Sequence, residues 1–319
     1  MNRSTIPSNL DKLAQLDPAL IVKQLDTAKI LLKRARSKWY TQQFVAPLLE
    51  LQSPLHRYYQ SAMDCAKFIS INNGKPKSAY CNTRVCNTCN RIRTAIGMNG
   101  YMEQLKGREW VMITLTDVNC QGHELRHEIA SLKRTVLLIR RKLKKRGIIL
   151  DGIVKAEITY NEKTKTFHPH LHVLAACQNI EFVAVELINE WLERRPTASI
   201  KAQNITRDPS GAFNELFKYT TKGYQREGKT LTIDALAIDT IMRAQYNTRS
   251  FQPFGNIRKV TEEVQEIIQA QPIEKPDGVY MWHDSDWYSL YTGEALSYYT
   301  PDPDIKITHA RPRAPTIIE

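Results

Sequence analysis

The spacing of apolar residues along the chain predicts several amphipathic helices. The clearest pattern runs from Glu124 to Arg146, where apolar side chains recur every three or four positions and form one stripe that can be buried. Gly147 follows directly and fits the C-terminal cap of such a helix, because glycine readily adopts a left-handed backbone. Weaker patterns of the same kind predict further helices over residues 8–60, 91–107, 179–195, 211–224 and 259–270.

Runs of β-branched and other apolar residues predict strands at 66–71, 110–116, 153–160 and 167–176. The last two runs are joined by the polar segment 161–166, so we expect them to form an antiparallel hairpin. If Tyr160 pairs with Phe167, Glu157 lies directly opposite His170, whereas a shift of one residue would turn Glu157 to the other face. Together the elements predict an α/β (α+β) fold, with a central antiparallel sheet flanked by helices and a small N-terminal module.

Three of the eight histidines lie within the second strand of this hairpin, in the stretch His168-Pro169-His170-Leu171-His172. Successive side chains of a strand point to opposite faces, so His170 and His172 share a face. Two imidazoles and the Glu157 carboxylate form a site for Mn²⁺ or Mg²⁺ that leaves open coordination positions. His168 has the same parity, but Pro169 disturbs the start of the strand, and we assign it a flanking role. The alternatives are a chance histidine cluster and a Glu157 that pairs with a lysine or a protonated histidine.

The predicted helix over 211–224 carries three chemically useful side chains on one face. Glu215, Tyr219 and Lys222 are spaced at i, i+4 and i+7. A phenol can attack phosphorus, an ammonium can stabilise the resulting charge, and a carboxylate can activate water. The pattern is weak when taken alone, because Glu–Lys and Glu–Tyr pairs are common on helix surfaces.

Four of the six cysteines follow a spacing that is typical of structural zinc sites. The pattern is Cys65-x15-Cys81-x4-Cys86-x2-Cys89, with the last pair forming a Cys-x2-Cys knuckle. We therefore predict Zn²⁺ at this site, with buried free thiols as the alternative. Cys65 is the least certain ligand of the four, and His56 is a possible substitute.

The charge of the chain favours a polyanionic partner. The 319 residues include 45 Lys and Arg against 33 Asp and Glu, which gives a net charge of +12. Eight basic residues fall between Lys133 and Arg146; we interpret them as a track for phosphates, although a solvated helix face is the commoner use of such charge. The residues assigned to DNA contact are Arg84, Arg140, Arg141, Lys144 and Lys145.

Two further patterns bear on the class of protein. No apolar run approaches the length of a membrane span and no signal-peptide pattern is present, so we expect a cytoplasmic protein with reduced thiols. The sequence His123-Glu124-Leu125-Arg126-His127 matches the H-E-x-x-H motif of zinc peptidases. Both of its histidines lie on the side of the predicted helix away from the buried Leu125, which argues against a peptidase.

With these residues in hand, the chain resembles the rolling-circle replication initiators of small plasmids, within the HUH endonuclease superfamily. Its closest resemblance is to the branch with a zinc module and a single catalytic tyrosine. Asn87 is a departure from the pattern, because a proline is expected in the cysteine knuckle. The resemblance rests on four blocks in the expected order: Tyr80-Cys81-x-x-Arg84-x-Cys86-x-x-Cys89, Ile113-Thr114-Leu115-Thr116, His168-Pro169-His170-Leu171-His172-Val173-Leu174, and Glu215-x-x-Lys218-Tyr219-x-x-Lys222.

The resemblance implies a DNA-nicking mechanism. Tyr219 would cut one strand at the double-strand origin, keep the 5′ phosphate as a phosphotyrosine, and free a 3′-OH for DNA synthesis. The metal on His170, His172 and Glu157 would polarise the phosphate, since a free tyrosine with a pKa of about 10 is a poor nucleophile at neutral pH. Glu215 would activate the water that ends the cycle. The implied partners are plasmid origin DNA, with a single-stranded or cruciform nick site, and the host helicase and polymerase.

The predicted organisation has four parts: a helical region at 1–60, the cysteine module at 61–107, a nuclease domain at 108–229 and a partly extended C-terminal region at 230–319. Two other functions remain open on the sequence. A relaxase or transposase of the same superfamily would share the histidine site but serve conjugation or mobility. A zinc-dependent DNA-binding regulator would bind DNA without cutting it.

Overall fold

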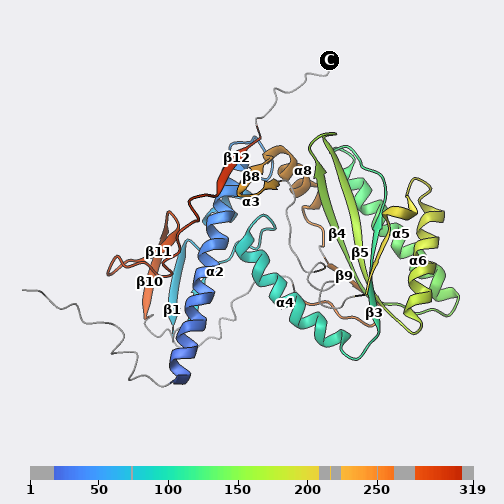
Figure 1. Ribbon diagram of the computed structural model, residues 1–319, viewed down its shortest axis with the longest axis horizontal. Helices are drawn as coiled ribbons and strands as arrows, with labels where there is room; N and C mark the ends of the chain where they lie inside the picture. Colours follow the sequence, from blue (N-terminus) through green and yellow to red (C-terminus); the bar gives the residue numbers. More distant parts are fainter. Residues whose placement is uncertain are drawn as a thin grey trace, which may run out of the picture.

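A five-stranded antiparallel sheet forms the centre of one lobe of the molecule (Figure 1). The computed structural model describes residues 18–72, 75–207, 216, 224–249, 251–261 and 277–310. The fold is α+β, with antiparallel sheets flanked by helices, as the sequence predicts. The strands of this sheet lie in the order β6 (Asn204–Thr206), β3 (Trp110–Thr116), β5 (Thr166–Ala176), β4 (Asp151–Asn161) and β9 (Phe251–Phe254).

The predicted hairpin is present with the predicted register. Tyr160 pairs with Phe167, and Glu157 lies opposite His170. The turn between the strands is closed by the Asn161 side chain, whose Oδ1 accepts a hydrogen bond from the Lys163 amide at 3.0 Å. Alternation along both strands therefore divides the side chains of β4 and β5 between two faces of the sheet.

Two helices, α5 (Leu125–Lys145) and α6 (Ile180–Arg194), cover the first of these faces (Figure 1). The predicted stripe of α5 is buried throughout, and Gly147 has the positive φ of +82° expected of a C-terminal cap. The second face packs against α4 (Asn87–Leu105), where Tyr101 and Leu105 meet Met112 and Leu174 of the sheet. It is this second face that also bears His170, His172 and Glu157.

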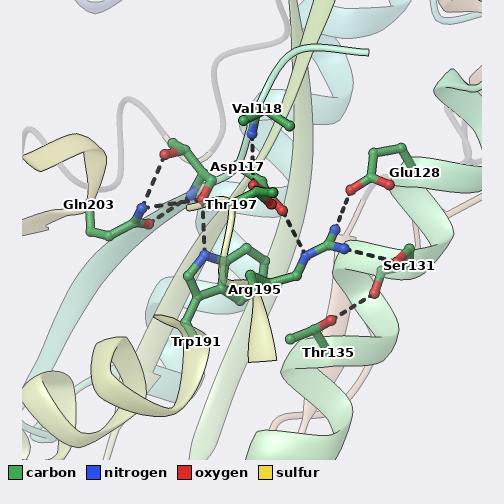
Figure 2. Close-up of polar contacts among 10 residues, drawn as sticks. Asp117, Val118, Glu128, Ser131, Thr135, Trp191, Arg195, Thr197 and Gln203 are labelled. Atoms are coloured by element: carbon green, nitrogen blue, oxygen red, sulfur yellow. Dashed lines mark hydrogen bonds and ion pairs between the residues drawn. The ribbon is translucent and has the colours of Figure 1, made fainter. Parts of the chain in front are cut away.

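A polar network fixes the end of β3 against α5 and α6 (Figure 2). The buried Trp191 donates its indole N–H to the carbonyl of Thr116 at 2.9 Å. The Arg195 guanidinium forms an ion pair with Asp117 at 3.1 Å and a second, very close one with Glu128 of α5. These contacts attach the C-terminal end of β3 to the two helices.

The other lobe is built from α2 (Pro18–Leu49), α3 (His56–Asp64) and a four-stranded sheet (Figure 1). The strand predicted at 66–71 lies at Phe68–Asn72 (β1) and pairs with β2 (Lys75–Ser78). On its other side β1 pairs with β10 (Gly278–His283), which pairs in turn with β11 (Asp286–Ser289). The C-terminal region thus completes the sheet of the cysteine module, which the sequence did not lead us to expect.

The region after residue 224 contains more regular structure than predicted. β7 (Tyr224–Glu227) pairs with β8 (Thr230–Ile233), which pairs in parallel with β12 (Lys306–His309). Helix α8 (Ala235–Gln245) packs against both α2 and α5 and so connects the two lobes. None of the helices that the structure describes is long and apolar enough to cross a membrane.

Two predicted helices lie largely outside the described residues. Of the helix predicted over 211–224, only Leu216 and Tyr224 are among the described residues, and Tyr224 begins β7. Of the helix predicted over 259–270, residues 259–261 are not helical and the remainder lies outside the described part. The four domain boundaries predicted from the sequence stay a prediction.

Candidate active site and metal centres

The hairpin brings Glu157, His170 and His172 into one buried cluster. One potential ligand atom from each residue lies within 4.8 Å of the other two. Glu157 Oε2 is 3.3 Å from His172 Nε2, and the two imidazole rings are 5.1 Å apart. All three residues are more than nine-tenths buried, so little of the site is exposed to solvent.

The neighbours of the histidines orient their rings. His170 Nδ1 is 3.2 Å from the His168 carbonyl oxygen, which can only accept, so Nδ1 carries the proton and Nε2 keeps its lone pair. His172 Nδ1 lies 3.2 Å from the hydroxyl of Thr114 on β3. Burial lowers the pKa of His170 to about 4, despite the opposing effect of Glu157. His170 is therefore neutral near pH 7, which is the form that binds metals.

The donor set fits a divalent cation. His172 Nε2 is buried and has no hydrogen-bond partner among the residues that the structure describes. Two imidazoles and one carboxylate, with positions left for water or phosphate, suit Mn²⁺ and are acceptable to Mg²⁺. His168 is not part of the cluster; its Nδ1 pairs with Asn119 Oδ1 at 3.0 Å, which agrees with a flanking position.

A buried lysine beside the cluster was missed by the sequence analysis. Lys155 Nζ is 3.6 Å from Glu157 Oε2, and the side chain is 5% exposed. Lys155 precedes Glu157 by two positions on β4, so the alternation that placed Glu157 on this face also places Lys155 there. The Glu157 carboxylate faces both a lysine and a histidine, and it is also close enough to both histidines to bind a metal with them. Its two predicted roles, as an ion-pair partner and as a metal ligand, are therefore compatible.

Of the predicted catalytic helix, the structure places one residue. Glu215, Tyr219 and Lys222 lie outside the described residues. Leu216 is fully buried and packs with Met112, Ile153 and Leu174. By strand parity these three residues are on the same face of the sheet as His170 and His172, so Leu216 packs on the face that bears the histidine cluster.

The four predicted cysteines form a second cluster. The sulfur atoms of Cys65, Cys81, Cys86 and Cys89 all lie within 4.8 Å of one another. Cys89 Sγ is 3.6 Å from Cys65 Sγ and 3.6 Å from Cys81 Sγ. Tetrahedral zinc with Zn–S bonds of about 2.3 Å requires sulfur atoms roughly 3.8 Å apart, so the spacing fits Zn²⁺. Cys65 is part of the cluster, whereas His56 is exposed and is not.

The pKa values of the cysteines shift in different directions within the cluster. Hydrogen bonds from the Cys65, Cys86 and Cys89 thiols lower the pKa of Cys81, which favours the form that binds metal, whereas the hydrogen bond to Cys81 raises the pKa of Cys65. Lys38 of α2 is 2% exposed, and its ammonium donates to the Cys65 carbonyl at 2.6 Å. A buried positive charge at this point offsets part of the negative charge of the thiolates.

A comparison with protein families matches residues 75–277, well over half of the chain, to a family described as replication protein. The chain belongs to this family. Among curated proteins it is 30% identical to a "Protein rep" of Staphylococcus aureus over 184 residues, 50% of this chain and 80% of that protein. It is 25% identical to a "Protein rep" of Streptococcus pneumoniae over 257 residues, 72% and 77% of the two chains. No solved structure matches it.

The matched range contains the Glu157 cluster and three of the four cysteines. The resemblance to a plasmid Rep initiator is thus confirmed at the level of the family, whereas the single-tyrosine branch stays a prediction. The two histidines of the H-E-x-x-H motif are not in either cluster of potential metal ligands among the described residues. His123 precedes α5, and both His123 and His127 are exposed.

The structure separates most of the predicted DNA-binding residues of this Rep-family protein from the histidine site. Helix α5 covers the face of the sheet opposite to His170 and His172, so its basic residues do not border the histidine cluster. Arg141, Lys144 and Lys145 are exposed there, while the Arg140 guanidinium stacks 3.8 Å above the Phe254 ring.

Other basic groups of this helix already have partners. Lys142 pairs with Glu190 of α6 at 2.5 Å, and Arg146 pairs with Glu186 at 2.7 Å. Arg84, in the cysteine module, donates to the Gln245 carbonyl at the end of α8, at 2.8 Å. A DNA-binding role for Arg84, Arg140, Arg141, Lys144 and Lys145 stays a prediction.

Proposed function

We propose that this protein starts rolling-circle replication of a plasmid by nicking one strand of the double-strand origin. The observation that supports this most strongly is the buried Glu157–His170–His172 cluster, on one face of a strand pair, in a chain of the replication-protein family. A metal-dependent nuclease needs such a set of two imidazoles and a carboxylate to hold the ion that polarises the phosphate. We place this activity in the cytoplasm, with plasmid origin DNA as the substrate.

Tyr219 is the proposed nucleophile. Two residues lie between it and Leu216, which packs on the face that bears the histidine cluster, so three steps along the chain place its Cα at most about 11 Å from that of Leu216. A divalent metal bound by the cluster would act as a Lewis acid on the scissile phosphate.

The reaction exchanges one phosphodiester for another. The bond between Tyr219 Oη and phosphorus forms as the bond from phosphorus to the 3′ oxygen breaks. The phenolic proton passes to water and the 3′ oxygen takes one up, which leaves a 5′-phosphotyrosine and a free 3′-OH. Lys222 would stabilise the phenolate, and Glu215 would later activate the water that hydrolyses the phosphotyrosine. The host helicase and polymerase would then use the opened strand.

Tyr219→Phe tests the proposal directly, because phenylalanine keeps the ring but cannot form the phosphotyrosine bond. With supercoiled origin plasmid and Mn²⁺, we expect the variant to lose nicking and the covalent protein–DNA adduct, both read on a denaturing gel. Tyr224→Phe is the matched control, since Tyr224 begins β7 and should leave both products unchanged. An adduct that persists in Tyr219→Phe would contradict the tyrosine assignment, and wild-type protein that nicks nothing with Mn²⁺ would contradict the function.

A further inference from the structure

A groove lined by basic residues lies in the lobe that holds the cysteine module, between α2, α4 and the β7–β8 hairpin. Its volume is about 670 Å³. Five cations line it: Lys33 and Arg36 from α2, Arg91 from α4, and Arg226 and Lys229 from the hairpin. We call it the α2–α4 groove; none of its lining residues belongs to the histidine site or to the basic stripe of α5.

Helical periodicity explains how two elements supply its walls. On α2, Lys33, Arg36 and Tyr40 are spaced at i, i+3 and i+7, and so lie on one face. On α4, Asn87, Asn90, Arg91 and Thr94 follow the same rule from the first turn of the helix onward. The two faces meet because α2 and α4 pack against each other. The groove therefore combines cations with amide and hydroxyl groups, which are the side chains that contact nucleic-acid backbones.

Few of the positive charges in the groove are paired with acidic side chains. Among the residues that the structure describes, no carboxylate lines it, and Lys229 is the lining cation with acidic partners, Asp304 at 2.6 Å and Asp302 at 3.3 Å. Arg91 donates to the Ser37 hydroxyl at 3.0 Å and to the Lys33 carbonyl at 2.6 Å, so it is held in place by neutral groups. Desolvation and the neighbouring Arg36 and Arg34 guanidinium groups lower the pKa of Arg91.

Like charges held this close repel one another and reduce the stability of the free protein. An anion bound in the groove would relieve that repulsion. Lys33, Arg36 and Arg226 are exposed, and they lie on elements that are distant in sequence but share one concave surface. A row of phosphates matches cations distributed in this way better than a single small anion does, because duplex DNA carries one charge per about 1.7 Å of its axis.

We propose that the α2–α4 groove binds the phosphate backbone of duplex DNA and so anchors the origin while the histidine site acts on the nicked strand. The identification of the bound duplex as origin DNA rests on the proposed function, whereas the groove and its charge are observed independently of it. Tyr40 lies beside Arg36, with the guanidinium 5.8 Å from the ring centre, and provides an apolar wall against which a sugar can pack.

The test compares two triple variants of equal charge change. Lys33→Gln, Arg36→Gln and Arg226→Gln remove three exposed cations of the groove. Lys67→Gln, Lys106→Gln and Lys201→Gln remove three exposed cations elsewhere and serve as the control. Affinity for a fluorescein-labelled duplex of mixed sequence is measured by anisotropy over a range of salt concentrations, because backbone contacts do not depend on sequence. Circular dichroism melting confirms that each variant folds.

We expect the groove variant to bind the duplex at least about tenfold more weakly, with a salt slope reduced by about 3, and the control to bind like the wild type. Equal losses in both variants, or normal binding by the groove variant, would overturn the proposal, as would a groove that binds ATP but not the duplex. Nicking of origin plasmid by the wild type is measured separately. Its absence refutes the proposed function, whereas the salt slopes still decide the role of the groove.

Discussion

The chemistry of the histidine cluster depends on which ring nitrogen each imidazole presents to Glu157. The His168 carbonyl fixes the proton of His170 on Nδ1, and the Thr114 hydroxyl can accept one from His172 Nδ1. His170 Nε2 is then left as a lone-pair donor, and His172 Nε2 lies 3.3 Å from Glu157 Oε2. These orienting groups come from two strands, so the metal site depends on the sheet as well as on the three ligands.

We predict that His172→Ala weakens Mn²⁺ binding by at least about tenfold, because it removes one of two nitrogen ligands from a small set. Isothermal titration with Mn²⁺ measures the effect without relying on nicking. His127→Ala is the matched control, since His127 is exposed on α5, across the sheet from the cluster. Equal Mn²⁺ affinity in wild type and His172→Ala would show that the ion binds elsewhere.

Asp151 offers a residue whose effect should depend on pH. Burial alone would raise the pKa of Asp151, but hydrogen bonds from the Asn256 amides and from Arg108 hold it below its usual value. A lowered pKa in the folded state means that the stabilisation is fully present above the unfolded pKa, near 3.9, and is lost as the pH falls through the folded pKa.

We therefore predict that Asp151→Asn lowers the free energy of unfolding by about 1–2 kcal/mol at pH 7, and that the difference from wild type shrinks below about pH 4. Urea denaturation at pH 7, 5 and 3 measures it. A difference that stays constant down to pH 3 would mean that the charge of Asp151 plays no part. Gly255 makes the contact possible, because a Cβ there would lie 2.0 Å from Asp151 Oδ1.

At the scale of elements, the ion pairs of Arg195 hold the end of β3 to α5 (Figure 2). Asp117 is 5% exposed at its side chain, so removal of its partner leaves a buried carboxylate without a counter-charge. We predict that Arg195→Ala costs about 3 kcal/mol of unfolding free energy, measured by urea denaturation. Arg207→Ala is the control, because its pair with Glu181 is exposed on both sides and should contribute less than about 1 kcal/mol.

The same scale shows why some elements were predictable from the sequence. Helix α5 and the β4–β5 hairpin are specified locally, by a continuous apolar stripe and by a short polar turn, and the hairpin register was enough to place Glu157 opposite His170. The pairing of β1 with β10 joins segments from opposite ends of the chain, and no local pattern specifies it. The basic stripe of α5 was correctly placed on a helix, but its position across the sheet from the metal site depends on packing.

Some residues of the candidate sites could not be identified from the sequence, because their roles depend on tertiary contacts. Lys155 was within reach of the parity argument that identified Glu157, but a lysine in a strand is usually solvated. Lys38 becomes informative only once α2 is packed against the cysteines, where its ammonium meets the Cys65 carbonyl. The α2–α4 groove combines residues from three separate elements, and the sequence offered only the periodicity of its two helices.

At the scale of the whole molecule, the C-terminal strands support the cysteine cluster. Trp287 on β11 is fully buried, stacks edge-on against Trp282, and donates its indole N–H to the carbonyl of Ala66 at 2.8 Å. Ala66 directly follows Cys65 and has a positive φ of +52°, a conformation that non-glycine residues adopt only when their surroundings hold them there. The sheet that contains β10 and β11 thus fixes the backbone beside the first cysteine.

We predict that Trp287→Ala lowers the unfolding free energy by about 3–5 kcal/mol and speeds the release of zinc to a colorimetric chelator, because the backbone at Cys65 loses its support. The control is Tyr291→Ala, whose side chain is 74% exposed and which should change neither quantity. Destabilisation with an unchanged release rate would mean that the cluster keeps its geometry without the C-terminal strands. Faster release would show that residues 278–289 stabilise the geometry of the cysteine cluster and are a structural part of the cysteine module.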